Sequence, residues 1–284
     1  MLDSRWQSLT TEEPITYSEG GLVMLDDLAV LSFTGSDVRS FLQGYFTCDT
    51  SRISDQALYP AALCNLQGRV TAFGWALAVE ETQLLWIVPH CVVPKLQVVL
   101  KPYLAFSKTR MAILVDDHLL LASISPDGSG NIAEEVHLEL ITSETNLQQR
   151  WQSLGTGQRN DIDSALIKAR VPWLTAAAAD RFLPQMLNLV EIGAISFDKG
   201  CYLGQEVVAR AQHRGKVKRR LTPLHHSQPI AASPGTELTD SLGRSVGMVI
   251  QSVADSASAM SLCVLQINAE EPFEDPDTGL IMHP

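Results

Sequence analysis

The chain has 284 residues, of which 45% are hydrophobic and 19% charged, a composition typical of globular proteins that argues against a disordered or low-complexity chain. Its formal net charge of -11 disfavours non-specific binding to nucleic acid or anionic membrane, so any contact with a polyanion would have to be local. The first residues lack the apolar core of a signal peptide, and no stretch approaches the ~18 apolar residues of a membrane span. We therefore expect a cytoplasmic protein without a membrane partner.

The first part of the chain predicts alternating strands and helices. Residues 21–35 carry β-rich apolar runs, and a short helix follows for which Ser36 or Asp37 is the expected N-cap. Residues 58–89 alternate like consecutive antiparallel strands. These elements favour an α+β fold of mixed order.

Further along, the pattern changes from mixed to purely β. Helices are predicted over 94–106 and 143–155, with two short strands between them in 111–140 around the turn SPDGSG. The last quarter holds short β-like runs separated by turn residues. We therefore predict an α+β body over residues 1–220 and a small β-barrel over residues 221–284.

The five cysteines form no recognisable framework. Their number is odd, and no C-x-x-C pair or Cys/His cluster of zinc spacing occurs, so we expect neither structural disulfides nor an intrinsic metal. Free cysteines are mostly small buried hydrophobes, and four of these five fit that description. The five are Cys48, Cys64, Cys91, Cys201 and Cys263.

Cys201 stands in a different context, the segment DKGCYLGQEVVARAQHRGKVKRR over residues 198–220. Residues 194–197 are β-like, and the stretch after the cysteine predicts a helix in which Glu206 pairs with Arg210 at i, i+4. Cys201 is thus expected in a strand-to-helix turn.

Such a turn has two interpretations. The positive end of the helix and Lys199 would favour the reactive thiolate of Cys201. Gly200 and Gly204 would permit positive φ and the close approach of another molecule's backbone or of a flat ligand. Alternatively, the glycines shape a tight turn and the cysteine fills a gap beneath it. Spacing alone leaves both interpretations open.

The same segment carries a family resemblance. KGCYLGQEVVAR resembles the signature K-G-C-[FY]-x-G-Q-E-x-x-x-R of the YgfZ-type proteins, folate-binding relatives of the glycine-cleavage T-protein that act in iron-sulfur cluster maturation. The likeness continues in FLQGYFTCDT, CNLQGRV, the run leading into the signature, and PGTELTDSLGRSVGMV, so it covers the chain from about residue 20 to its end. The matching positions are Lys199, Gly200, Cys201, Tyr202, Gly204, Gln205, Glu206 and Arg210.

The resemblance implies both a fold and a function. The fold would be a T-protein-like ring of three domains, in which two interleaved α/β domains precede a C-terminal β-barrel. The protein would bind tetrahydrofolate or a derivative near the centre of the ring. Its partners would be folate, iron-sulfur client enzymes and assembly factors, with Cys201 as the reactive group. Whether the protein is itself an enzyme is left open.

The chain also departs from the T-protein pattern at two places. Ala72 and Phe73 stand where T-proteins have an Asp-Asp pair whose first member assists aminomethyl transfer, and neither side chain can move a proton. Lys168 and Arg170 stand where T-proteins have the glutamate and glycine of a pterin-binding segment. These two cations would hold the glutamyl carboxylates of a folate, or else belong to a solvated face.

Other folate contacts are predicted from the same resemblance. Lys168 cannot accept the amino hydrogens of a pterin, so Glu191, just ahead of the signature, is the candidate acceptor. Leu28 and Trp173 would line an apolar pterin pocket, or alternatively belong to the core.

The basic run HRGKVKRR, residues 213–220, has no interleaved aromatic residues for base stacking. We predict a solvated linker into the barrel and no direct contact with nucleic acid. An effect on transfer RNA would then act through a modifying iron-sulfur enzyme.

Three functions follow as hypotheses. The first is a folate-dependent accessory protein that builds or repairs iron-sulfur clusters in client enzymes, using Cys201. The second is a tetrahydrofolate-dependent aminomethyltransferase, which is disfavoured by Ala72 because that reaction needs a proton-transfer group. The third is a non-catalytic folate-binding regulatory module in which the cysteine motif only shapes the backbone.

Overall fold

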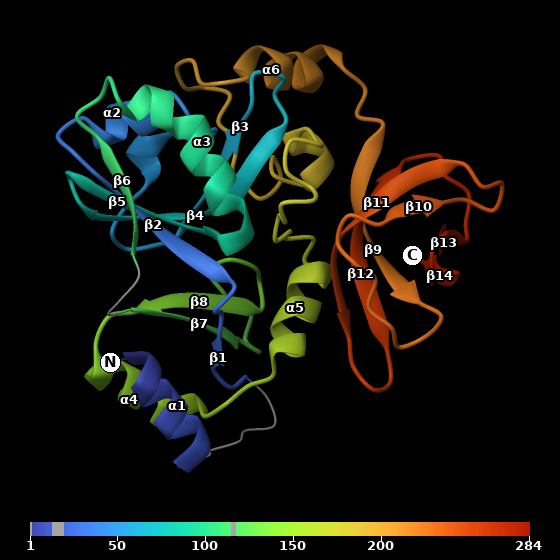
Figure 1. The fold of residues 1–284 in the computed structure, drawn as a ribbon, viewed down its shortest axis with the longest axis horizontal. Helices are drawn as coiled ribbons and strands as arrows, with labels where there is room; N and C mark the ends of the chain where they lie inside the picture. The colour runs from blue at the N-terminus through green and yellow to red at the C-terminus, as the bar shows by residue number, and fades with distance from the viewer. Residues whose placement is uncertain (1, 13–19, 115–117) are drawn as a thin grey trace.

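The structure is a computed structural model that describes residues 2–12, 20–114 and 118–284. Residues 115–117, which belong to the stretch 111–140 predicted to hold two strands, lie outside the described residues. Within the described chain, two sheets with their helices form a body, and a barrel lies beside it (Figure 1).

A five-stranded antiparallel sheet forms the first part of the body, and its strand order is β3-β4-β5-β2-β6. The consecutive pairing of β3, β4 and β5 agrees with the alternation predicted over 58–89. Its strands are β2 (Leu28–Thr34), β3 (Tyr59–Cys64), β4 (Val70–Glu80), β5 (Gln83–Pro89) and β6 (Arg110–Leu114). The helical segments here are α2 (Val38–Gln43), η1 (Thr50–Arg52), η2 (His90–Val92) and α3 (Val93–Leu104).

A three-stranded sheet forms the second part of the body. It joins β1 (Val23–Met24), β7 (Leu119–Ile124) and β8 (Val136–Ile141), and it is accompanied by α1 (Leu2–Glu12) and α4 (Glu144–Leu154). Strand β1 pairs with β7, although every strand of the five-stranded sheet lies between them in sequence. The two parts of the body are therefore interleaved, and the β-rich run at 21–35 is divided between the two sheets.

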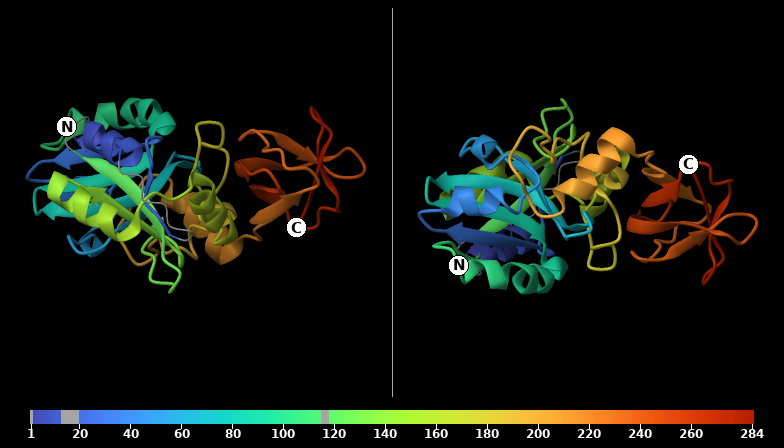
Figure 2. Two further views of the ribbon diagram at one scale, coloured as in Figure 1. Left: turned by 90° about the horizontal axis from the view of Figure 1, so that it is seen from below. Right: turned by 90° about the horizontal axis from the view of Figure 1, so that it is seen from above.

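Six strands close the C-terminal barrel in the order β10-β11-β12-β9-β14-β13, which confirms the predicted barrel. The predicted boundary after residue 220 falls inside its first strand. The barrel stands apart from both sheets in the two views of Figure 2. Its strands are β9 (Arg219–His226), β10 (Glu237–Thr239), β11 (Ser245–Ala254), β12 (Ala259–Gln266), β13 (Phe273–Asp275) and β14 (Leu280–His283).

The helix α5 (Arg159–Lys168) connects body and barrel. It packs against β11 and β12 of the barrel and against β1, β7 and β8 of the body. The chain then passes through η3 (Pro184–Leu187) and α6 (Gln205–Arg214), which lies at the top of Figure 1, before it enters β9. One buried apolar cluster contains residues of both sheets, α5 and the barrel, so the three parts share a core. No helix in the described ranges has the length and apolar character needed to cross a bilayer.

The strand predicted over residues 194–197 is absent, and this prediction was wrong. Ala194 and Ile195 are buried, but the segment has no ladder partner. Instead, Thr47 fixes it from both sides: its hydroxyl donates to the carbonyl of Ala194 at 2.7 Å, and its carbonyl accepts from the amide of Ser196 at 2.9 Å. The apolar character of these residues reflects burial against a distant loop and not strand pairing.

Candidate functional site

The loop that carries Cys201 is anchored by Lys199. The Lys199 ammonium donates hydrogen bonds to the backbone carbonyls of Gln43, Phe46 and Cys48, each at 2.7 Å. An ammonium has three N–H donors, so three carbonyls satisfy it completely. Burial lowers the pKa of Lys199 to about 8, and the neighbouring Cys48 and Asp49 partly oppose this shift. Lys199 therefore fastens the cysteine loop to the segment that follows α2.

Gly204 provides a second anchor at the start of α6. Its φ of +82° places it in the left-handed region, and it is the N-cap of the helix. A Cβ atom there would lie 2.3 Å from the carbonyl oxygen of Asn65 and 2.9 Å from the Cα of Gly68. The turn between β3 and β4 thus touches the backbone of Gly204, and the two glycine-containing motifs of the sequence meet in space.

Tyr202 forms the underside of the loop. Its ring is buried, and its centroid lies 5.2 Å from Nζ of Lys199. Burial first, and then the neighbouring Cys64, raise the pKa of the Tyr202 hydroxyl. This hydroxyl has no hydrogen-bond partner among the described residues. The side chains of Lys199 and Tyr202, which flank Cys201 in the motif, thus point into the protein.

Cys201 itself is exposed, so the loop presents its thiol to solvent from a fixed backbone. Three other cysteines, Cys48, Cys64 and Cys263, are buried, and burial raises the pKa of each thiol, that of Cys48 to about 12. The fifth, Cys91, is also exposed.

We expect iodoacetate to label Cys201 faster than Cys91 in the native protein, and to leave the three buried cysteines unmodified. Cys201 belongs to a segment with a local excess of cations, which attracts an anionic reagent. Mass spectrometry of timed samples at neutral pH measures the order of labelling. Faster labelling of Cys91 would contradict an activated Cys201.

The other motif residues have structural surroundings of their own. Gln205 begins α6, and its amide donates to the carbonyl of Tyr202 at 3.1 Å. Glu206 and Arg210 are both exposed, and the ion pair predicted between them is not among the ion pairs of the described residues. Exposed i, i+4 pairs contribute little, so the fold does not require this one. Gly200 is exposed and does not have a positive φ, in contrast to the prediction.

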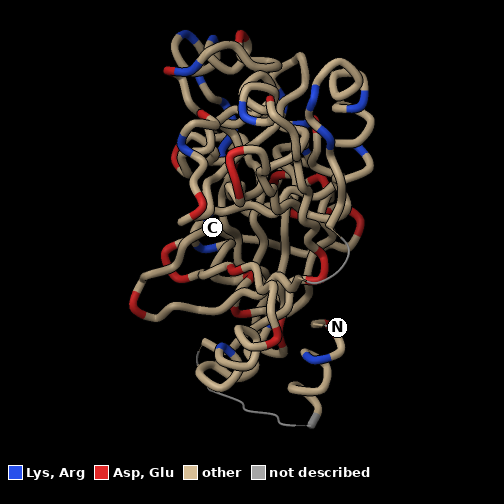
Figure 3. The backbone as a smooth tube through the Cα atoms, turned by 90° about the vertical axis from the view of Figure 1, so that its left-hand side faces the viewer, with Lys and Arg blue, Asp and Glu red and all other residues tan. Residues whose placement is uncertain are grey.

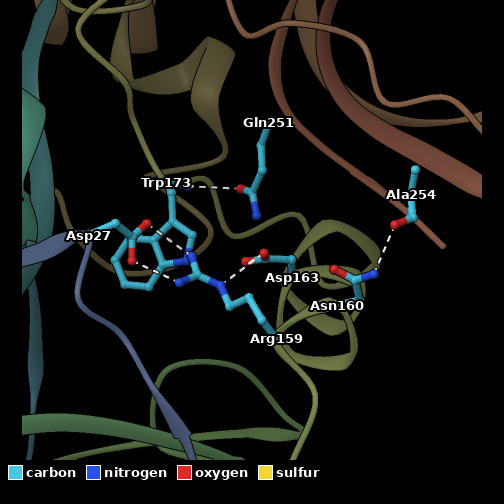
Figure 4. A network of polar contacts seen from close by, with 7 residues as sticks. All are labelled: Asp27, Arg159, Asn160, Asp163, Trp173, Gln251 and Ala254. Carbon is cyan, nitrogen blue, oxygen red and sulfur yellow. Dashed lines mark hydrogen bonds and ion pairs between the residues drawn. The ribbon is translucent and has the colours of Figure 1, made fainter.

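A second polar site lies where α5 meets β2 and the barrel. The Arg159 guanidinium forms a two-pronged ion pair with Asp27, at 2.8 and 3.0 Å, and its Nε bonds Asp163 at 2.9 Å (Figure 4). Figure 4 also shows the side-chain oxygen of Gln251, from β11, accepting from the backbone amide of Trp173 at 3.1 Å. Residues from body and barrel thus converge at one junction.

This junction contains polar atoms with unused hydrogen-bonding capacity. The indole N–H of Trp173, the amide nitrogen of Gln251 and one carboxylate oxygen of Asp163 are buried and have no partner among the described residues. Buried polar groups are normally paired, so such a cluster is a place where a polar ligand would be complementary. Burial raises the pKa of Asp163, which Arg159 partly opposes.

The residues predicted to hold folate do not all come together. Leu28 is buried beside Asp27 and lines a hollow of about 500 Å³ next to α1. Lys168, the last residue of α5, lines a hollow of about 390 Å³. Arg170 and Glu191 share a different one, also of about 390 Å³, between η3 and α6. Lys168 and Arg170 thus face separate hollows although they are two residues apart.

Sequence reasoning missed the polar residues of the junction. Arg159 and Asp163 stand at i, i+4 in the helix α5, a spacing that signals an ion pair, but nothing in the sequence brings Asp27 to them. Within the described ranges, no group of three or more His, Cys, Asp or Glu residues is arranged to hold a metal ion.

The position of the T-protein aspartate is occupied by an apolar strand. Ala72 is fully buried in β4 opposite Leu63, and Phe73 is fully buried beside it. A nearby carboxylate, Asp180, is already engaged: it accepts from the Thr71 hydroxyl at 2.6 Å and pairs with Lys95 at 2.6 Å.

Comparisons with known proteins agree with this description of fold and motif. No family model matches the chain. The chain is 30% identical over 285 residues to the tRNA-modifying protein YgfZ of Escherichia coli O157:H7 (strain EC4115 / EHEC), which covers 88% of this chain and 86% of that protein. The fold of this chain is similar to that of the glycine cleavage system aminomethyltransferase T from Bartonella henselae. The TM-score is 0.72 and the sequence identity 12%, over 94% of this chain and 85% of the Bartonella chain. With the T-protein fold and the intact cysteine signature on its anchored loop, the chain belongs to the YgfZ family.

Proposed function

We propose that this protein is a folate-dependent accessory factor for the assembly or repair of iron-sulfur clusters in client enzymes, with Cys201 as its reactive thiol. The observation that carries the proposal is an exposed cysteine on a loop fixed by Lys199 and Gly204. The name of its relative, tRNA-modifying protein, supports clients that include enzymes acting on transfer RNA. A thiolate ligates iron and exchanges with other sulfur species, and both reactions need an accessible sulfur.

Replacing Cys201 by Ala or Ser tests this proposal. In cells that depend on the variant protein, we expect the activity of an iron-sulfur enzyme that modifies transfer RNA to fall ~10-fold or more, because the nucleophile is gone. The level of the modified nucleoside, measured by mass spectrometry, reports that activity. Cys91→Ala is the matched control, since it removes the other exposed thiol, and it should leave the level unchanged.

The same experiment separates the first hypothesis from the third. If Cys201→Ala retains full client activity and its thermal unfolding midpoint is unchanged, the thiol of Cys201 has no role in that activity. That outcome would leave a folate-binding module in which the motif only shapes the backbone.

The proposal places folate at the junction of α5, β2 and the barrel. A pterin presents both hydrogen-bond donors and acceptors on a flat ring, and the unpaired groups of this junction offer both kinds of partner. Asp163 would accept the pterin amino hydrogens, while Trp173 and Gln251 would donate to ring oxygen or nitrogen atoms. Asp163 suits this task better than Glu191, which is exposed and lines the hollow at α6.

We expect Asp163→Asn to weaken tetrahydrofolate binding ~10-fold or more, because a carboxylate acceptor is replaced by an amide that can turn its donor toward the ligand. Isothermal titration calorimetry with mono- and tri-glutamyl tetrahydrofolate measures the affinity at low and high salt. The control is Asp161→Asn, an exposed carboxylate of the same helix. Equal affinities for both variants and the wild type would remove the junction from the proposal.

Aminomethyl transfer, the second hypothesis, receives support from the fold alone. The buried Ala72 in β4 opposes it, because no proton-transfer group occupies that position.

A further inference from the structure

Charge is distributed very unevenly along this acidic chain. Residues 198–220 contain seven Lys and Arg against two Asp and Glu, a formal charge of +5. The remaining residues therefore carry -16 to give the total of -11. Figure 3, which keeps the vertical direction of Figure 1, shows Lys and Arg gathered toward the upper end, where α6 lies, whereas Asp and Glu are spread over most of its height. The total charge thus conceals one basic region.

Six cations of this region form a continuous basic strip from the middle of α6 into β9. None of their side chains makes an ion pair or hydrogen bond with another described residue. Five of the six are exposed, while Arg219 is half-buried. The basic strip consists of Arg210, Arg214, Lys216, Lys218, Arg219 and Arg220.

The backbone arranges the basic strip in a regular way. Arg210 and Arg214 are one turn apart on α6, and Gly215 then turns the chain into an extended course, with φ −91° and ψ 158°. Lys216, Lys218 and Arg220 are exposed, whereas Val217 and Arg219 between them are less so. Alternate residues of an extended chain share one face at a spacing of ~7 Å, so these three cations form a row.

A hollow of about 390 Å³ adjoins the row. Arg220 and Arg170 both line it, and Glu191 is the one carboxylate among its lining residues. The carbonyl of Arg170 is held by the side-chain amide of Asn188 at 3.1 Å, which fixes this part of the wall. A second guanidinium therefore stands beside the row, opposite one negative charge.

We propose that the basic strip, together with Arg170, binds the phosphate backbone of RNA. Unpaired arginines and lysines in a row are complementary to a chain of phosphates, and guanidinium forks match phosphate oxygens. The strip has no exposed aromatic residue and, among the described residues, no exposed large apolar residue between 208 and 229. Protein interfaces depend on such apolar anchors, so an RNA backbone fits this surface better than an acidic protein.

The binding is backbone-directed and confined to one face. Without aromatic side chains the strip reads no bases, and the negative charge of the remaining surface repels RNA elsewhere. The inference uses no property of the thiol, so it is independent of the function proposed above. It differs from the prediction of a solvated linker, which rested on the absence of interleaved aromatic residues and on the acidity of the whole chain.

Fluorescence anisotropy with a labelled transfer RNA tests this inference. We expect the logarithm of the affinity to fall linearly with the logarithm of salt concentration, by ~0.7 to 0.9 per neutralised phosphate. The triple variant Arg214→Gln, Lys216→Gln and Lys218→Gln should bind RNA ~10-fold or more weakly than the wild type. The magnitude of its slope of log affinity against log salt concentration should be smaller by ~2. The control triple Arg5→Gln, Lys101→Gln and Arg110→Gln removes the same charge outside the strip and should bind like the wild type.

Polyglutamate serves as the competing polyanion. Displacement of the RNA by polyglutamate at equal charge concentration would show a surface for acidic proteins and would overturn the inference. The absence of salt-dependent binding, or equal losses in the two triple variants, would also overturn it. Thermal unfolding of both triple variants confirms that neither loss reflects misfolding.

Discussion

Replacing Lys199 by Met is expected to release the cysteine loop and to lower the free energy of unfolding by about 2–4 kcal/mol. Methionine is of similar length but donates no hydrogen bond, so the carbonyls of Gln43, Phe46 and Cys48 lose their common partner. Each half-buried polar group left unpaired costs about 1–3 kcal/mol, and local relaxation toward water reduces the sum. Urea unfolding followed by circular dichroism measures the change.

The functional effect of Lys199→Met should exceed its effect on stability. A loop that is no longer fixed presents Cys201 in many positions, and positioning contributes strongly to reactivity. Client activity should therefore fall nearly as far as in Cys201→Ala, at temperatures where the protein is still folded. The control is Lys101→Met, because Lys101 is exposed, lies outside the basic strip and has no side-chain hydrogen bond or ion pair with another described residue. Unchanged stability in Lys199→Met would show that the three carbonyls do not depend on the ammonium.

Replacing Gly204 by Ala is expected to destabilise the protein by about 2–4 kcal/mol. The added methyl group would be placed at 2.3 Å from the Asn65 carbonyl oxygen, so either α6 or the turn between β3 and β4 has to move. Overpacking of this kind costs about 1–3 kcal/mol, and a positive φ adds about 1 kcal/mol for a residue with a Cβ.

Gly243→Ala separates these two contributions. Gly243 also has a positive φ, +71°, but a Cβ atom there would meet no atom within 4 Å. We expect only the conformational cost of about 1 kcal/mol in this variant. Thermal or urea unfolding of both variants gives the comparison, and equal losses would show that the contact between Gly204 and Asn65 is not tight.

Local sequence patterns predicted much of the architecture. The alternation over 58–89, the β texture after residue 221 and the helical period after Gly204 all correspond to elements of the structure. The helix α1 also had a local signal, since Leu2, Trp6 and Leu9 are buried at helical spacing, with Trp6 packed edge-on against Trp151.

The remaining features depend on contacts between distant segments, which no local pattern contains. The apolar run at 194–197 was predicted as a strand from its composition. These residues are apolar because they pack against Thr47 and its neighbours, and a strand buried in a sheet has the same composition. One interpretation of Gly204 was the approach of another molecule's backbone or of a flat ligand, whereas the structure packs Gly204 against Asn65 and Gly68 of the same chain. At the junction, Arg159 and Asp163 stand at i, i+4, but their ion pair was not predicted, and only the fold brings in Asp27 and Gln251.

The interleaved course of the chain has a consequence for folding kinetics. Lys199 is separated by 156, 153 and 151 residues from the three carbonyls that it binds, so the loop is closed only after most of the body has been synthesised and brought together. Contacts of such long range form slowly, because the entropy of closing a large loop is lost before the contacts are gained. A nascent or partly folded chain therefore carries Cys201 on an unanchored segment. We expect the positioned thiol to appear late in folding, as a property of the completed body.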